Sequence, residues 1–170
     1  PDYWKKALPE SPEHPANFVR WADAAEFCNR LTELDGMPIS QQCYSQVQTA
    51  QGLRWRQKPE ALELSGYRLP TDDEWEIACR AGSRTARPFG DATRWLPKYT
   101  ATASNGFSAE AVGRRKPNAF GLFDMLGNLS EWIHTHPTEA DSLLGLKRLR
   151  GGSVWTSQDR LLSGARFTSD

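Results

Sequence analysis

Hydrophobic residues follow a helical period in one early segment of the chain. After a short apolar run at 18–21, they recur at spacings of three and four along one face: Trp21, Ala24, Ala25, Cys28, Leu31 and Leu34. Asp35-Gly36 comes directly after this segment and Pro38 follows, a combination that is typical of a helix end. The pattern therefore predicts an amphipathic helix from Ala22 to about Leu34.

Start signals predict a second helix in the middle of the chain. Thr71 is a good N-cap residue, and Glu74 three residues later completes a reciprocal capping box. Asp72 and Asp73 place negative charge at the positive end of the helix dipole. Trp75, Ala78 and Cys79 form the predicted buried face, and Gly82 is the predicted stop. The capping pattern favours helix-start chemistry over a catalytic carboxylate pair as the role of these acidic residues.

The remaining segments show no long period of either kind. Short strands are predicted at 43–45 and 53–55, and a further strand, entered through a glycine pair, at 149–155. Residues 1–17 are polar and rich in proline, which predicts an arm or linker, and 83–119 are predicted to be mostly loop. The elements are therefore few and short.

Composition and charge exclude several classes of function. A chain of 170 residues suits one domain with one core. Lys plus Arg equals Asp plus Glu, 21 each, so no net field attracts nucleic acid or an anionic membrane. No apolar run approaches the roughly 20 residues that span a bilayer, and the N-terminus lacks the apolar stretch of a signal peptide. We expect a soluble protein or part of a longer one, with the cytoplasm as the favoured compartment and neither nucleic acid nor membrane as partner.

Aromatic, glycine and cysteine counts add detail. Seven Trp and seven Phe can build a well-packed core, while 13 Gly and 11 Pro indicate many turns. Three cysteines, Cys28, Cys43 and Cys79, form no CxxC pair. Ordinary thiols in a reducing compartment are favoured. A Cys28–Cys43 or a Cys43–Cys79 disulfide bridge remains the alternative.

Five blocks of sequence, in order along the chain, resemble the formylglycine-generating enzyme, or sulfatase-modifying factor, family. They are Phe18–Ala24 with the helix after it, Gly66–Glu76, Pro117–Leu122, Asp124–Trp132 and Arg150–Ser153. The resemblance spans about residues 15–166. It implies an α+β, C-type-lectin-like fold with two main helices, short antiparallel sheets and many loops. The domain itself would cover residues 18–170.

The resemblance also bears on catalysis. Members that oxidise a sulfatase cysteine to formylglycine hold copper with two cysteines, five residues apart, just after the motif that Gly151-Gly152-Ser153 matches. Soft thiolates select Cu(I). The corresponding positions are Thr156 and Leu161, and no cysteine follows Cys79. We therefore expect no copper and no oxidase activity.

Two histidines that are close in sequence form a second candidate metal site. His134 and His136 flank one residue, so a strand would point both to one face. The pair can bind a metal, but solvated loop histidines are favoured because a third ligand is not evident.

The resemblance implies structural Ca²⁺ as a cofactor. The ligands of the first site would be two carboxylates and two backbone carbonyls: Asp124, Glu131, Gly127 and Leu129. Oxygen ligands of this kind are those that Ca²⁺ favours. Alternatively, both carboxylates accept hydrogen bonds from loop amides. A second site would use Asn105 and the carbonyl of Phe107, although Ala101 replaces its other Asn.

Family domains carry further strands at both ends, upstream of residue 1 and downstream of about Arg166. The chain as given holds neither, so strand edges would be exposed. We expect an additional domain or another subunit to cover them.

The favoured function is that of a non-catalytic module that binds a protein or peptide ligand. An aromatic anchor, adaptable polar groups and arginine together form a typical binding surface: Trp155, Thr156, Ser157, Gln158, Asp159, Arg160 and Arg166. The domain would then be a variable binding protein, since some relatives are diversified in this region, or a module of a larger signalling protein. The alternatives are a solvated loop around one core Trp, and an oxidoreductase acting with a partner's metal.

Overall fold

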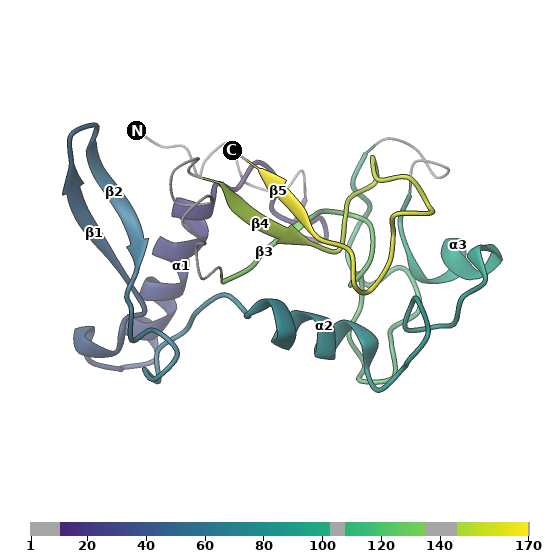
Figure 1. Ribbon diagram of the computed structural model, residues 1–170, viewed down its shortest axis with the longest axis horizontal. Coiled ribbons are helices and arrows are strands. Elements are labelled where there is room, and N and C mark those ends of the chain that lie inside the picture. The colour runs from purple at the N-terminus through teal and green to yellow at the C-terminus, as the bar shows by residue number, and fades with distance from the viewer. Residues whose placement is uncertain (1–10, 103–107, 135–145, 170) are drawn as a thin grey trace. The chain divides into compact units, whose positions relative to one another are not determined.

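The computed structural model describes residues 11–102, 108–134 and 146–169, and its elements are drawn in Figure 1. The chain divides into two compact units, one formed by Phe18–Leu69 and the other by the segments 1–17 and 70–170. The described elements are short helices and short antiparallel strands. The predicted α+β class is therefore confirmed. None of the described helices has the length and apolar character to cross a bilayer.

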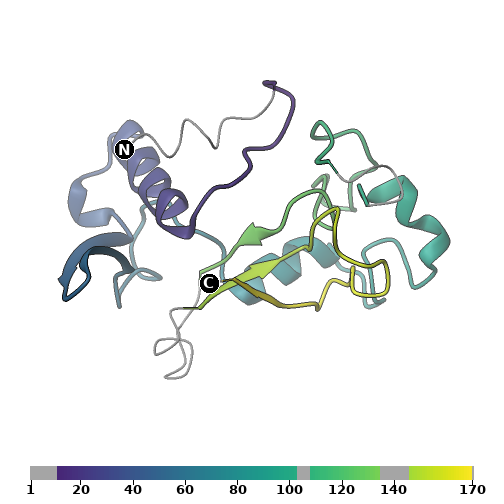
Figure 2. The same ribbon diagram turned by 90° about the horizontal axis from the view of Figure 1, so that it is seen from above.

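Helix α1 (Trp21–Leu34) and the hairpin of β1 (Tyr44–Thr49) and β2 (Gly52–Gln57) build the first unit, with the 3-10 turn η2 (Ile39–Gln41) between them. The two strands pair antiparallel from Tyr44 opposite Gln57 to Thr49 opposite Gly52. Helix α1 lies beside the hairpin in both views (Figures 1 and 2). The predicted helix and both predicted strands of this region are confirmed.

Polar residues take part of the buried face of α1, which the hydrophobic stripe did not predict. Leu34, assigned to the stripe, is 68% exposed, whereas Asn29 and Thr32 are buried. The Asn29 amide donates to the Tyr44 carbonyl at 2.9 Å and accepts from the Tyr44 amide at 3.2 Å. The Thr32 hydroxyl accepts from the Tyr67 amide at 2.9 Å. Buried polar groups are tolerated where they are hydrogen-bonded, so these two positions hold the hairpin and the following loop to the helix.

All three cysteines are buried free thiols, so neither bridge considered above forms. Burial raises the pKa of Cys28 and of Cys79 to about 11. Such thiols stay protonated at neutral pH and are poor nucleophiles and metal ligands. They act as small core residues.

Helix α2 (Asp72–Arg80) begins the main part of the second unit, as its capping signals predict. The Thr71 hydroxyl accepts from the Glu74 amide at 3.2 Å, and the Glu74 carboxylate accepts from the Thr71 amide at 2.8 Å. Ala81 rather than Gly82 takes the left-handed C-cap position, with a φ of 47°. The buried face of the helix joins the core of this unit, formed by Trp75, Cys79, Leu126 and Ile133, with Phe89 and Met125 packed against them.

A three-stranded antiparallel sheet lies over α2 in both views (Figures 1 and 2). Its order is β3 (Glu131–Trp132), β4 (Lys147–Arg150) and β5 (Phe167–Ser169). The 3-10 turn η3 (Thr93–Trp95) and the short helix α3 (Leu96–Tyr99) belong to the same unit.

The sequence pattern predicts a strand over 149–155 that the chain enters through the glycine pair. This prediction was wrong, because the strand lies before the pair and not after it. Strand β4 ends at Arg150, and Gly151 and Gly152 lead out of it with φ values of 82° and 72°. Left-handed backbone is incompatible with a strand and favours glycine. A Cβ at Gly151 would also lie 3.1 Å from the Met125 carbonyl oxygen. The pair therefore turns the chain out of the sheet and into the C-terminal loop.

Arg150 joins the sheet, α2 and the C-terminal loop. Its side chain is fully buried, and its guanidinium donates to Asp72 at 2.8 Å and to Glu76 at 2.6 Å. It also donates to the carbonyls of Ser163 and Ala165, at 2.9 and 2.8 Å. Asp72 therefore does more than start a helix, because it also neutralises a buried cation.

Candidate functional site

The C-terminal loop, residues 151–166, begins with a tight turn that exposes one aromatic side chain. The Thr156 amide donates to the Ser153 carbonyl at 2.9 Å, and the Ser153 amide donates to the Thr156 hydroxyl at 2.9 Å. The Trp155 amide donates to the Ser153 hydroxyl at 3.2 Å. Three bonds on one turn fix its backbone, and Trp155 at its tip is 69% exposed.

The buried side chain of Arg87 is hydrogen-bonded to the backbone in the middle of this loop. It is only 3% exposed. Its guanidinium donates to the carbonyls of Leu161 at 2.8 Å, Gln158 at 2.9 Å and Asp91 at 2.8 Å. Sequence reasoning missed this residue, which lies in a segment predicted to be loop, and no local pattern marks it. A buried guanidinium with several carbonyl partners gives the loop a defined conformation.

The side chains of Thr156 and Leu161 meet at Gly152. A Cβ on Gly152 would lie 2.8 Å from Leu161 Cδ2 and 3.0 Å from the Thr156 hydroxyl oxygen. Leu161 is fully buried. The two positions five residues apart are thus brought together in space, where they present a methyl group and a hydroxyl.

The polar residues of the loop tip are exposed and partly organised by one another. Ser157, Gln158, Asp159 and Arg160 are all exposed, and the Arg160 amide donates to the Ser157 carbonyl at 2.9 Å. A hydrogen bond from the Ser157 side chain and the nearby Arg160 charge lower the pKa of the Asp159 carboxyl. With Trp155 and Thr156 they form one continuous stretch of six residues.

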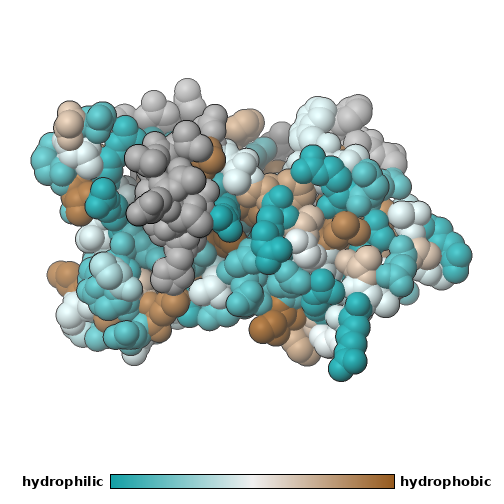
Figure 3. Space-filling model, viewed as in Figure 1, coloured by the Kyte–Doolittle hydropathy of each residue, from teal (hydrophilic) through white to brown (hydrophobic). Residues whose placement is uncertain are grey.

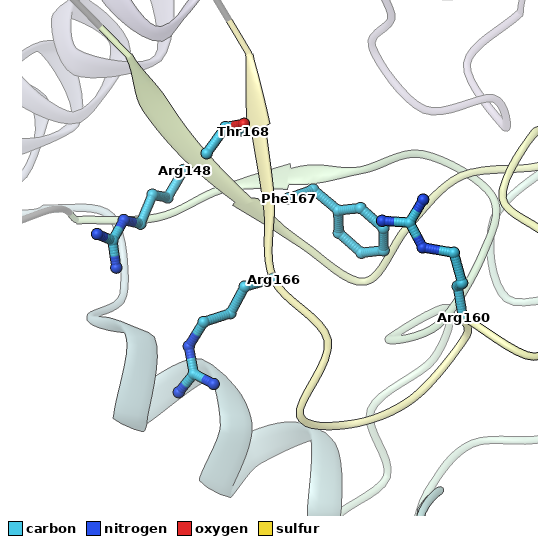
Figure 4. Close-up of a pocket in the computed structure, with 5 residues that line it drawn as sticks. All are labelled: Arg148, Arg160, Arg166, Phe167 and Thr168. Carbon is cyan, nitrogen blue, oxygen red and sulfur yellow. The ribbon is translucent and has the colours of Figure 1, made fainter. Parts of the chain in front are cut away.

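Arg166, the seventh predicted residue, lies apart in sequence and is paired. Its guanidinium donates to Asp72 at 2.6 Å, and its side chain remains 51% exposed. Arg160 lies over the Phe167 ring, with its Cζ 5.3 Å from the ring centroid. Phe167 directly follows Arg166 in the sequence. Figure 4 shows both arginines at one hollow of about 540 Å³. The structure thus brings the last predicted residue to the same region as the loop tip.

The predicted calcium loop brings together two carboxylates. Asp124 accepts from the Gly113 amide at 2.8 Å, which is the loop-amide alternative. Glu131 accepts from the Trp75 indole at 2.6 Å. Burial raises the pKa of the Glu131 carboxyl, the indole bond opposes this, and the Asp124 charge raises it further. A divalent cation would offset repulsion of this kind, and carboxylate oxygens are ligands that Ca²⁺ favours.

The other predicted ligands of the first site are backbone carbonyls. The Gly127 amide donates to the Gly151 carbonyl at 3.0 Å, which orders the loop at that ligand. Within the described ranges no group of three or more His, Cys, Asp or Glu gathers around one point. Ca²⁺ would therefore need the predicted backbone carbonyls of Gly127 and Leu129. Asn105 and Phe107 lie outside the described residues.

The expectation of solvated histidines was wrong for His134, because it is only 3% exposed. Its amide donates to the Pro70 carbonyl at 2.8 Å, and it forms an isolated bridge with Thr71. This pairing places His134 beside Thr71, the N-cap residue of α2. His136 lies outside the described residues.

Comparison with known families identifies the fold. The sulfatase-modifying factor enzyme 1-like domain matches residues 3–169. The chain belongs to this family. The resemblance found in its motifs is thereby confirmed, and the described helices and sheets agree with the family's α+β fold.

Solved structures and curated relatives of this sulfatase-modifying-factor domain differ in what their names describe. Treponema denticola variable protein 1 is 25% identical, with a TM-score of 0.76 over 96% of this chain and 69% of that one. Chaperone protein LppX of Paenibacillus barcinonensis is 25% identical over 91% of this chain and 65% of its own. The formylglycine-generating enzyme of Mycobacterium tuberculosis is 37% identical over 45% of this chain and 31% of its own. The chain thus spans less than two thirds of both curated relatives.

Proposed function

We propose that this sulfatase-modifying-factor domain is a non-catalytic module that binds a protein or peptide ligand. Its binding surface, here called the C-terminal surface, comprises seven residues: Trp155, Thr156, Ser157, Gln158, Asp159, Arg160 and Arg166. The observation that carries this proposal is the 69% exposed Trp155 on a loop whose backbone is hydrogen-bonded to buried Arg87.

A pre-ordered loop favours binding because less conformational entropy is lost on association. Large aromatic side chains and arginine dominate binding hot spots, while serine, threonine and glutamine supply adaptable hydrogen bonds. On the face shown in Figure 3, hydrophobic residues form separate patches among hydrophilic ones.

The side chains at Gly152 argue against oxidase chemistry. Threonine and leucine occupy the two positions at which the resemblance expects copper-binding cysteines, and neither offers the thiolate that selects Cu(I). Leu161 fills its position with a fully buried side chain. One relative, 33% identical over 58% of this chain and 36% of its own, is named inactive C-alpha-formylglycine-generating enzyme 2 of Bos taurus. Loss of catalysis on this fold therefore has a parallel by name.

The variable-protein neighbour supports a more specific form of the proposal. A protein named for variability carries a fold that superimposes on 96% of this chain. Its name calls that protein variable and says no more. We propose that the C-terminal surface here is likewise a place where residues can change without loss of the fold, which sequencing sibling strains over 154–166 will test.

Two further parts of the proposal concern what else the domain binds. Ca²⁺ would be held by Asp124, Glu131 and the carbonyls of Gly127 and Leu129, where it would neutralise two carboxylates and fix the loop. Strand β5 pairs with β4 on one side only among the described strands. An additional domain or another subunit would cover that edge, because unpaired strand edges are otherwise liable to association.

Panning a displayed random-peptide library against the immobilised chain tests the binding role. Peptides enriched on wild type are then measured by fluorescence anisotropy against wild type and Trp155→Ala. Removing a central aromatic anchor lowers affinity by about tenfold or more. Phe120→Ala, which removes another exposed aromatic (61% exposed) outside the C-terminal surface, is the matched control and leaves affinity unchanged. Equal affinities for wild type and Trp155→Ala contradict the proposed surface.

A further inference from the structure

Three arginines line one hollow at the β5 edge of the sheet. It has a volume of about 540 Å³ and is lined by Arg148, Arg160, Arg166, Phe167 and Thr168. None of these five described residues is acidic. Because the whole chain has no net charge, the cluster is a local feature and not part of a generally basic surface.

Strand register explains how the lining side chains are arranged. Arg148 of β4 pairs directly with Thr168 of β5, so both side chains point to one face of the sheet. Arg166 precedes Thr168 by two residues, so extended backbone brings it to the same face. Figure 4 shows Arg148 and Arg166 pointing the same way on one side of β5. Phe167 points to the other side, where Arg160 approaches its ring from the C-terminal loop. The hollow is therefore built by two strands and the loop.

The guanidinium groups differ in how they are engaged. Arg166 is paired with Asp72, a residue that Arg150 also binds. Arg160 lies over the Phe167 ring, 5.3 Å from its centroid. A guanidinium that lies over an aromatic ring can still donate hydrogen bonds from its N–H groups, which arginine uses to recognise carboxylates. Arg166 already binds one carboxylate in this way, that of Asp72.

We propose that this hollow binds the carboxylates of an acidic peptide segment. The inference rests on the proposed function and names the chemistry of the ligand. Two or more carboxylates would engage Arg148, Arg160 and the exposed side of Arg166, while the peptide chain contacts Phe167 and Thr168. A hollow of about 540 Å³ is larger than one anion and accommodates a few peptide residues.

The lining favours peptide carboxylates over phosphate. Phosphate sites typically use backbone amides at a helix N-terminus or in a Gly-rich nest. The hollow is lined instead by side chains of two strands and a loop, with an aromatic ring beside them. Planar carboxylates and an apolar stem match that combination.

Three labelled peptides of equal length test the inference by fluorescence anisotropy. One contains several Glu residues and has an amidated C-terminus, the second replaces each Glu with Gln, and the third is neutral with a free C-terminal carboxylate. The first is expected to bind and the second not. The third separates side-chain carboxylates from a chain terminus, since one carboxylate alone is expected to bind more weakly.

Substitutions then locate the site. Arg148→Gln and Arg160→Gln are each expected to weaken binding of the Glu peptide by about threefold or more, and the double variant by more than either. Arg84→Gln, at an exposed arginine of the same unit that does not line the hollow, is the control and leaves affinity unchanged. Raising the ionic strength also weakens the Glu peptide, because exposed charges are screened.

Several outcomes overturn the inference. Equal binding of the Glu and Gln peptides removes the role of charge, and equal effects of Arg84→Gln and the hollow variants remove the site. Inorganic phosphate that displaces the Glu peptide better than acetate at equal ionic strength replaces carboxylate with phosphate as the ligand. If library peptides depend on Trp155 but not on Arg148 or Arg160, the inference fails while the proposed function stands. Arginine-dependent binding of the Glu peptide that Trp155→Ala leaves unchanged supports the hollow and contradicts the role of Trp155 as anchor.

Discussion

Two buried arginines organise the unit that carries the C-terminal loop. Arg150 is fully buried between Asp72 and Glu76, and Arg87, 3% exposed, donates to three carbonyls. Charged groups are buried at acceptable cost only when they are paired and hydrogen-bonded. These residues therefore stabilise one arrangement of loop, sheet and helix.

Removing the Arg150 side chain is expected to destabilise the chain strongly. Arg150→Ala removes the buried donor that Asp72 and Glu76 share, while Arg166 and Arg80 still pair with these carboxylates at the surface. It also leaves the carbonyls of Ser163 and Ala165 without this donor. Breaking a buried pair on one side typically costs about 3–5 kcal/mol. Urea unfolding followed by tryptophan fluorescence measures this change. Arg84→Ala, at an exposed arginine, is expected to stay within about 0.5 kcal/mol of wild type.

The same carboxylates predict a loss of stability in acid. The pKa values of Asp72 and Glu76 lie below their ordinary values of 3.8 and 4.5. Burial alone would raise them, but hydrogen bonds from Arg166 and Arg150 to Asp72, and from Arg150 and Arg80 to Glu76, outweigh this effect. A depressed folded-state pKa contributes stability that is complete above the unfolded value. That contribution disappears as the pH falls below about 4 and through the folded pKa values. Urea midpoints at stepped pH test it: a stability that rises on acidification over this range contradicts the pairing.

At the scale of elements, local signals and distant contacts had unequal predictive value. The capping box at Thr71 and Glu74 lies within four residues, so sequence alone predicted the start of α2. Arg87 contacts Leu161 across 74 positions, and no sequence window contains both. The glycine pair at 151–152 suits a strand entrance or exit equally well until the Met125 carbonyl beside it is known. The backbone carbonyls of Gly127 and Leu129 are predicted as calcium ligands only by the family resemblance, because no local sequence signal marks them.

The support of the C-terminal loop by Arg87 can be tested directly. Arg87→Leu keeps an apolar side chain at this position but leaves the carbonyls of Gln158 and Leu161 without their donor. Unsatisfied buried acceptors cost about 1–3 kcal/mol. Hydrogen exchange followed by mass spectrometry is expected to accelerate over 155–163 and to stay unchanged in the hairpin of β1 and β2. Unchanged exchange over 155–163 contradicts the supporting role.

At the scale of the whole molecule, family membership fixes the fold but leaves activity open. The match covers residues 3–169, whereas the curated relatives described above extend well beyond the part that this chain covers. Functions named for those relatives include chaperone and enzyme. Activity must therefore be argued from the site, and here the site combines an exposed Trp155 with threonine and leucine at the expected copper positions.

Calcium provides a second test at this scale. Ca²⁺ added to chelator-treated protein is expected to raise the melting temperature, because a ligand that binds only the folded state stabilises it. At a hundredfold excess over Kd the gain is about 2.7 kcal/mol. Asp124→Asn with Glu131→Gln is expected to abolish the response, and Mg²⁺ is expected to give a smaller one. An identical calcium response in the double variant contradicts the site.

The most direct measurement incubates the purified chain with Cu(I), oxygen and a sulfatase peptide that contains the target cysteine. Mass spectrometry of the peptide reads out the aldehyde, with a copper-loaded formylglycine-generating enzyme as the positive control. Because Thr156 and Leu161 cannot supply thiolates, the peptide is expected to keep its cysteine unchanged while the control converts it. Conversion by this chain to the formylglycine aldehyde contradicts a non-catalytic binding domain.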